Sequence, residues 1–224
     1  MAPRVAVVLS GCGFLDGAEI HESVLTLLAL DLRGAAVRCF APSKSFDVVN
    51  HATQESSGET RDVLTEAARI CRGKIEDITK AKASDFDAVV LPGGFGAAKN
   101  LCTFATEGPS CSVDPGVETF LTQAHASGCV LGFACIAPAL CARVFGNLLH
   151  PNVTIGNDAG TAQAVQAMGA SHTNAPVTDI VVDEANRIVT TPAYMYDARI
   201  SEVHKGIDAM VERVLQMASA SAVA

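Results

Sequence analysis

Short apolar runs alternate with longer amphipathic stretches along the chain. Residues 4–10 form a continuous β-branched run that is bounded by Gly11, and residues 87–91 and 130–134 are similarly apolar. Such runs are typical of strands that are buried on both faces of a parallel sheet. We therefore predict a central strand at each of these three positions.

The stretches between the runs carry apolar residues at helical spacing. Residues 19–33 have this period and are closed by Gly34, and Asp114 is expected to cap a helix that begins at Pro115 and ends before Gly128. By the same criteria we predict further strands at residues 36–41 and 153–155, helices at 59–70, 136–145, 160–168 and 198–217, and a hairpin of residues 180–183 with 187–191.

The alternation of strands with helices predicts an α/β sandwich on a mostly parallel sheet, joined by right-handed crossovers. The 224 residues, of which 49% are hydrophobic, suffice for one compact core. No internal repeat divides the sequence. We expect residues 1–224 to form a single domain.

The charge and hydropathy of the chain limit the classes of partner that it is expected to bind. The chain has 24 acidic and 16 basic residues, a net charge of −8, and its Lys and Arg are scattered, so nucleic acid is not expected to bind. No apolar run approaches the roughly 20 residues that a membrane-spanning helix needs. The first residues lead directly into a strand without a secretory signal, which favours a cytoplasmic location unless a processed targeting segment has been left out.

The eight cysteines lie mainly inside apolar runs, a pattern that indicates reduced thiols rather than a disulfide framework. Cys102 and Cys111 are the nearest approach to a metal-binding pair, but a second pair at suitable spacing is missing. We predict no metal site.

Three strand-to-helix loops are chemically unusual, and loops of this kind converge at the carboxyl edge of a parallel sheet. They are residues 10–17, which include Cys12, residues 92–98, which include Gly93 and Gly94, and the junction at Cys135. The first loop lacks the third glycine of a dinucleotide fingerprint and the second lacks the Gly-Lys-Ser/Thr end of a P-loop, so neither predicts a bound nucleotide.

Cys135 is the candidate nucleophile. A residue at a strand-to-helix turn projects at the edge of the sheet, where the amides of the following helix, here beginning with Ile136, lower a thiol pKa and bind anions. Gly132 and Ala137 are small, as a nucleophile elbow requires. The alternative is an inert cysteine buried in the core.

Glu22 lies in the first turns of the helix that follows the first strand, so it can point into the same cleft. A partly desolvated carboxyl beside a thiol has a raised pKa and can transfer a proton. The alternative is a solvated residue on the helix surface. Gly93 and Gly94 permit close backbone approach and can supply an oxyanion-binding amide opposite that of Ile136, although Pro-Gly-Gly is also an ordinary turn.

The segments VVLSGCGFLDGAEIHESV, LPGGFGAAKNL, GFACIAPAL and IVTTPAYM closely resemble the ES1 family, whose bacterial branch is called ElbB or the sigma cross-reacting protein. That family belongs to the DJ-1/PfpI, class I glutamine amidotransferase-like superfamily. The resemblance implies a three-layer flavodoxin-like sandwich with a reactive cysteine on the elbow and a glutamate beside it. By position these residues are Cys135 and Glu22, with Gly94 and Ile136 at the anion-binding position. It also implies a homodimer, and for eukaryotic relatives a mitochondrial location.

The resemblance implies glyoxalase-like chemistry without a cofactor, in which a thiolate converts a small 2-oxoaldehyde such as glyoxal or methylglyoxal to a 2-hydroxy acid. Two alternatives stay open. One is amide hydrolysis, for which the C-terminal region offers only Glu202 and His204. The other is a redox-sensing or stress-response role for Cys135, in which Cys12 could take part.

One departure from the superfamily pattern concerns histidine. Many relatives have a histidine directly after the cysteine or on a later loop, whereas this chain has Ile136 and the segment VTIGND. His150 is the remaining accessory candidate, with an exposed loop position as its alternative. Without an imidazole, proton transfer would rest on Glu22.

Overall fold

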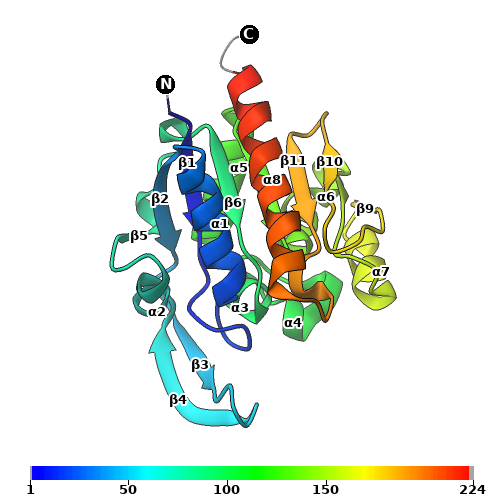
Figure 1. Ribbon diagram of the computed structural model, residues 1–224. Coiled ribbons are helices and arrows are strands. Elements are labelled where there is room, and N and C mark those ends of the chain that lie inside the picture. The colour runs from blue at the N-terminus through cyan, green and yellow to red at the C-terminus, as the bar shows by residue number, and fades with distance from the viewer. Residues whose placement is uncertain (1, 222–224) are drawn as a thin grey trace.

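The computed structural model describes residues 2–221 and is built around a seven-stranded sheet with the order β10-β11-β7-β6-β1-β2-β5 (Figure 1). All neighbouring strands are parallel except β10, which runs antiparallel to β11. The strands are β1 (Arg4–Val8), β2 (Ala36–Ala41), β5 (Ile75–Asp77), β6 (Ala88–Leu91), β7 (Val130–Ala134), β10 (Val181–Asp183) and β11 (Ile188–Thr191). The predicted mostly parallel α/β fold is confirmed.

The three most apolar runs of the sequence are the three strands at the centre of the sheet. β6 and β7 are buried at every residue, and β1 is buried from Val5 onward. In register, Val7 pairs with Val90, and Val90 with Gly132. Burial on both faces explains why these strands carry no alternation of polar and apolar residues.

Helices cover both faces of the sheet. In Figure 1, α1 (Ile20–Leu32) and α8 (Ile200–Ser221) lie side by side in front of it, and α5 (Pro115–Ala126) and α6 (Ala137–Leu149) lie behind. Each face has its own buried apolar cluster. The molecule is therefore a three-layer sandwich, as the resemblance implied.

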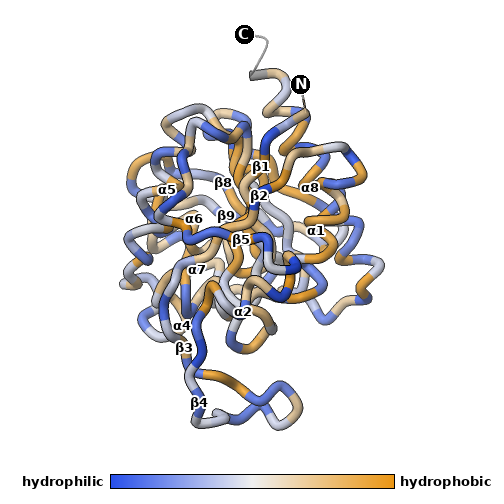
Figure 2. The backbone as a smooth tube through the Cα atoms, turned by 90° about the vertical axis from the view of Figure 1, so that its left-hand side faces the viewer, coloured by the Kyte–Doolittle hydropathy of each residue, from blue (hydrophilic) through white to orange (hydrophobic). Residues whose placement is uncertain are grey.

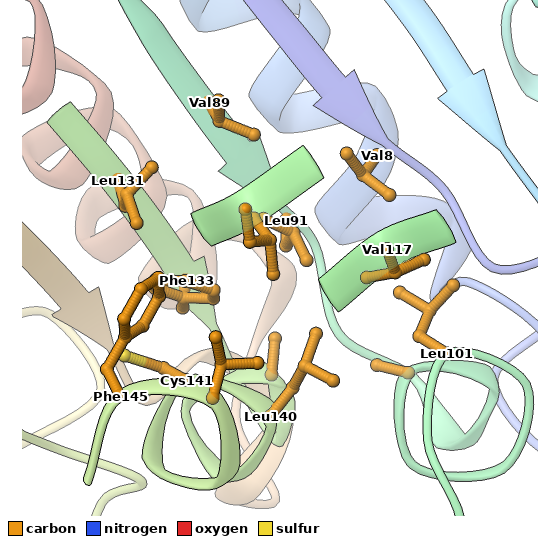
Figure 3. Close-up of a cluster of buried hydrophobic side chains, with 14 of the residues drawn as sticks. Val8, Val89, Leu91, Leu101, Val117, Leu131, Phe133, Leu140, Cys141 and Phe145 are labelled. Atoms are coloured by element: carbon orange, nitrogen blue, oxygen red, sulfur yellow. The ribbon is translucent and has the colours of Figure 1, made fainter. Parts of the chain in front are cut away.

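Figure 3 shows the cluster behind the sheet, where side chains of β1, β6 and β7 interlock with side chains of α5 and α6. Leu91 and Phe133 from β6 and β7 pack with Val117 of α5 and Leu140 of α6, and all four are essentially fully buried. Burial of a side chain of this size stabilises a fold by about 1.5–3 kcal/mol. This packing fixes α6, and therefore the junction at its N-terminus, against the sheet.

One predicted helix is partly wrong. Residues 59–62 belong to β4 (Ser56–Asp62), which pairs antiparallel with β3 (Ser45–Val49), and the helix α2 begins only at Val63 and ends at Ile70. The boundary is set by Asp62, whose side chain accepts hydrogen bonds from the backbone and side chain of Thr65 and caps the helix. The β3–β4 hairpin extends beyond one end of the sandwich (Figure 2), and Phe46 and Val48 of β3 are buried in one of the two apolar clusters.

The other predictions hold to within a few residues. The hairpin of β10 with β11 is confirmed, Asp114 caps α5 as expected, and the predicted strand at 153–155 is the two-residue β8. The remaining elements are α3 (Phe95–Lys99), α4 (Phe104–Glu107), α7 (Ala159–Ala167), β8 (Asn152–Val153), β9 (Ser171–His172) and four short 3-10 turns, of which η4 spans Ala193–Met195.

All eight cysteines are free thiols. Within residues 2–221, no helix combines the length and the apolar character needed to cross a bilayer.

Candidate active site

Cys135 sits on a strained turn between β7 and α6. Its φ of 59° lies in the left-handed region, which is uncommon for a residue with a side chain, and Ile136 follows it as the N-cap of α6. The Cys135 amide donates a hydrogen bond of 2.9 Å to the Thr191 carbonyl, which anchors the turn to β11. This is the geometry of the predicted nucleophile elbow.

Glu22 projects from the first turns of α1 and is completely buried. One carboxylate oxygen accepts a hydrogen bond of 2.8 Å from the Gly93 amide, and the other accepts one of 3.2 Å from the Tyr194 amide. Cys135 lies beside this carboxylate, because the position of a Cβ atom on Gly93 is 2.4 Å from Cys135 Cβ and 2.9 Å from Glu22 Oε2. The cysteine and the carboxyl group, from positions far apart in the sequence, are therefore neighbours in the fold.

The backbone around this pair is packed too closely for any side chain at Gly93. A Cβ atom there would lie 2.4 Å from the Cys135 Cβ and 2.9 Å from Glu22 Oε2. The next residue, Gly94, has a φ of 89° and faces the backbone of residues 17–19. Glycine at these two positions is therefore required by space and by conformation.

Burial dominates the electrostatics of the pair. It raises the pKa of Glu22 to about 7, with a further contribution from the negative charge of Glu19, and the hydrogen bonds from the Gly93 and Tyr194 amides only partly oppose this rise. Burial also raises the pKa of Cys135, and the neighbouring Glu22 adds to that effect. The nearby Gly94 and Ile136 amides oppose this rise in the thiol pKa, because they favour the thiolate form.

Cys135 opens onto a cavity of about 350 Å³. Most of the lining side chains are apolar, and many are aromatic. The lining residues are Phe14, Glu19, Gly94, Phe95, Ala98, Phe104, Ala105, Cys135, Ile136, Thr161, Tyr194 and Met195.

Tyr194 is a candidate that the sequence analysis missed. It lines the cavity from η4, and its hydroxyl shares a hydrogen bond of 2.9 Å with Nδ1 of His21 on α1. The preceding Ala193 has a φ of 45°, a strained conformation that brings the Tyr194 amide to Glu22. A signal was available, because IVTTPAYM runs off the carboxyl end of a strand that neighbours β7, at the edge where ligands bind.

Of the three accessory candidates, Gly93 lies at the pair, whereas Cys12 and His150 lie elsewhere. Cys12 lines a second cavity of about 320 Å³ beside the β3–β4 hairpin, together with Asp16 and His51. His150 is the C-cap of α6, where its Nδ1 pairs with the Gly169 carbonyl. Since α6 has 13 residues, this places His150 about 20 Å along the helix from the elbow.

Among the described residues that line the first cavity there is no histidine. His21 is linked to this cavity through Tyr194. Across residues 2–221, no three or more His, Cys, Asp or Glu side chains are grouped so that they could hold a metal ion.

Comparison with known proteins gives close relatives over nearly the whole chain, although no protein-family model matches the sequence. The human protein named glutamine amidotransferase-like class 1 domain-containing protein 3, mitochondrial, is 46% identical over 227 residues, which cover 96% of this chain and 84% of that protein. The rat protein named ES1 protein homolog, mitochondrial, is 45% identical with the same coverage.

Solved structures agree with the architecture. An isoprenoid biosynthesis protein with an amidotransferase-like domain from Ehrlichia chaffeensis superimposes with a TM-score of 0.89 at 35% identity, over 95% of this chain and 99% of that one. Glyoxalase III from Candida albicans has the same fold, with a TM-score of 0.61 at 14% identity, covering 96% and 97% of the two chains.

Proposed function

The chain belongs to the ES1 family, which has the DJ-1/PfpI fold, and from this premise we propose that it is a glyoxalase-type enzyme that converts small 2-oxoaldehydes to 2-hydroxy acids without a cofactor. The observation that carries the proposal is the close approach of Cys135 to the Glu22 carboxyl group, beside Gly93, on an elbow that faces a cavity. A solved glyoxalase III with the same fold adds support.

In the first step the Cys135 sulfur attacks the aldehyde carbon and Glu22 accepts the thiol proton. The raised pKa of the thiol does not prevent this reaction, because Glu22 lies beside Cys135 and can accept the proton as the carbon–sulfur bond forms. The aldehyde oxygen becomes an oxyanion near the Gly94 and Ile136 amides and then receives the proton from Glu22. The product is a hemithioacetal, and Glu22 is again a carboxylate.

In the second step Glu22 removes the proton from the carbon that bears sulfur, which gives an enediolate, and returns it to the neighbouring carbon. The carbon–oxygen bonds rearrange to a thioester on Cys135. Water then cleaves the thioester, releasing the 2-hydroxy acid and restoring the thiol. A pKa of about 7 suits a group that must accept and return protons at neutral pH.

The Tyr194 hydroxyl supplies the proton donor that a histidine provides in other members of the superfamily. Tyr194 lines the cavity with Cys135, and His21 behind it can exchange a proton with the phenol. In this scheme the phenol hydrogen-bonds to the ketone oxygen and stabilises the charge that develops there in the enediolate.

Two alternatives receive less support. Redox sensing requires a thiol that ionises readily, but burial raises the pKa of both Cys135 and Cys12. Amide hydrolysis by a cysteine requires an imidazole beside the sulfur. None of the described residues that line the cavity supplies one.

We also propose where the protein is located and how it assembles. The human and rat relatives are named as mitochondrial proteins, which supports a mitochondrial location and gives no support to a cytoplasmic one. A homodimer is proposed as well, and an exposed apolar stripe on α1 is its candidate contact surface.

The function is tested by following lactate formation from methylglyoxal with a chiral or NMR assay. The wild type is expected to produce lactate, whereas Cys135→Ala is expected to fall to the rate without enzyme. Glutamine should release no ammonia with either protein. Equal lactate formation by both proteins would refute the proposal.

A further inference from the structure

We infer that the Cys135 cavity selects 2-oxoaldehydes that carry a bulky, uncharged apolar substituent, such as an aryl group, in preference to glyoxal and methylglyoxal. This inference rests on the proposed function and specifies its substrate class. It follows from the size of the cavity, the chemistry of its walls and the distribution of charge around it.

The cavity is larger than the smallest 2-oxoaldehydes require. At the ~30 Å³ that one water molecule occupies in the liquid, its volume of about 350 Å³ holds about 12 non-hydrogen atoms. Phenylglyoxal has about that number, and methylglyoxal has about half of it. A small substrate would therefore leave much of the wall in contact with water and gain little from binding.

The wall is suited to an apolar group. Two of its aromatic side chains, Phe14 and Phe95, are 43% and 48% exposed, so a bound substituent would remove apolar surface from water. Such exposed aromatic surface is the kind that marks binding sites. The other apolar lining side chains are Ala98, Phe104, Ala105, Ile136 and Met195.

The charged groups that line the cavity disfavour anionic substrates; the basic Lys99 Nζ lies 5.1 Å from the centroid of the Phe95 ring, but it donates to the Leu15 carbonyl and Lys99 is not a lining residue. Among the described lining residues there is no Lys, Arg or His to pair with a carboxylate or phosphate. Glu19, whose side chain accepts a hydrogen bond of 2.6 Å from the Glu22 amide, contributes a negative charge. A 2-oxo acid or a phosphorylated aldehyde would meet repulsion and would lose its hydration without compensation.

The reactive and apolar groups share one space. Cys135 and the Gly94 backbone line the same cavity as Phe95 and Met195. When the aldehyde carbon is bound to the sulfur, a substituent on the adjacent ketone has to lie within this apolar space. Contacts with it would therefore be present in the transition state and would raise kcat/KM.

The test compares kcat/KM for phenylglyoxal, methylglyoxal and a phenylglyoxal with a para-carboxylate. Phenylglyoxal is expected to exceed methylglyoxal by about tenfold or more, the lower end of what a well-fitted apolar group contributes to discrimination. The para-carboxylate is expected to remove this advantage. Because phenylglyoxal also differs in intrinsic reactivity, variants are needed to assign the preference to the wall.

Phe95→Ala is expected to lower kcat/KM for phenylglyoxal by about fivefold more than it lowers kcat/KM for methylglyoxal, since truncation removes more apolar contact from the larger substrate. Phe104→Ala is a second variant with the same expectation. Leu148→Ala, at a residue 74% exposed on α6 and outside the cavity lining, is the matched control and should change neither value.

The possible results of these assays distinguish failure of the substrate-class inference from failure of the proposed glyoxalase function. Turnover of methylglyoxal with no preference for phenylglyoxal, or equal losses on both substrates in Phe95→Ala and Phe104→Ala, would overturn the substrate class and leave the glyoxalase proposal standing. Absence of turnover with every 2-oxoaldehyde would overturn both.

Discussion

At the scale of single residues, the proposed chemistry depends on whether the Glu22 carboxyl group holds its proton or has released it. Glu22 has no contact with solvent and a negative neighbour in Glu19, and both effects hold its pKa near 7. A carboxyl group with an ordinary pKa would be a much weaker base at neutral pH. The environment of Glu22 therefore makes it able to exchange a proton with its neighbour Cys135 at neutral pH.

The contribution of Glu19 can be tested through the pH dependence of activity. Because Glu22 must be a carboxylate to accept a proton, kcat/KM is expected to rise with pH through an apparent pKa near 7. Glu19→Gln removes a negative charge, so the Glu22 pKa falls and the rising limb moves to lower pH. The side-chain amide oxygen that this substitution introduces would still cap α1. An unchanged limb would contradict this assignment.

Gly93→Ala tests whether the backbone at Gly93 must lie close to Cys135 and Glu22. The added methyl group would overlap the Cys135 Cβ and crowd the Glu22 carboxylate, so we expect a loss of about 1–3 kcal/mol in unfolding free energy and loss of activity. Gly160→Ala on α7 is the control, because its Cβ would meet only Asp158 at an ordinary 3.6 Å. Urea unfolding measures the stability of both variants. A Gly93→Ala protein that is as stable and as active as the wild type would refute the packing argument.

Much of the candidate site could be predicted from sequence, because it depends on where strands end. Cys135 and Glu22 each follow an apolar run, and parallel strands bring such positions to one edge. The contact between Tyr194 and His21 could not be predicted, since it depends on the strained turn at Ala193. The residues that line the cavity come from separate segments that tertiary packing brings together, so no local sequence pattern identifies them.

At the scale of elements, the β3–β4 hairpin shows where the pattern of apolar and polar residues fails to predict the secondary structure. Residues 51–60 are all exposed, so the strand β4 has no buried face and no alternation to reveal it. The sequence pattern therefore extends the helical period of α2 backward over it. The central strands are predicted well for the opposite reason, because burial on both faces leaves an unmistakable apolar run.

The helix α1 carries the proposed dimer contact. Every fourth residue on one of its faces is apolar and 44–70% exposed: Ile20, Val24, Leu28 and Leu32. A continuous apolar stripe of this kind on a helix is suited to pairing with a second copy of itself. Charged residues in the stripe would oppose such pairing.

The double substitution of Val24 and Leu28 by Lys is therefore expected to convert a dimer to a monomer in light scattering coupled to size exclusion. Leu148→Lys, at a more exposed apolar residue on α6, should stay dimeric. A monomeric wild type, or a dimeric double variant, would refute this interface.

At the scale of the whole molecule, the raised pKa of Glu22 makes stability depend on pH. The folded protein holds this proton up to pH about 7, whereas the unfolded chain releases it near the ordinary value of 4.5. Protonation of Glu22 therefore stabilises the fold below pH 4.5, and this contribution is lost as the pH rises to about 7. The loss amounts to about 3 kcal/mol at ~1.4 kcal/mol per pH unit.

Glu22→Gln removes this titration and keeps a neutral side chain of the same shape. The difference in unfolding free energy between wild type and variant, measured by urea denaturation from about pH 4.5 to about pH 7.5, should therefore move steadily in favour of the variant as the pH rises. A difference that stays constant with pH would show that Glu22 titrates normally in the folded protein.

The most direct test of the account is a double-mutant cycle on the initial rate of 2-hydroxy acid formation, with wild type, Cys135→Ala, Glu22→Gln and the double variant. Because the two groups act on the same proton and the same carbon, each single substitution should abolish nearly all of the enzymatic rate, and the double variant should be no slower than Cys135→Ala. Substantial turnover by Cys135→Ala, or losses that multiply in the double variant, would contradict a shared role for the thiol and the carboxyl group.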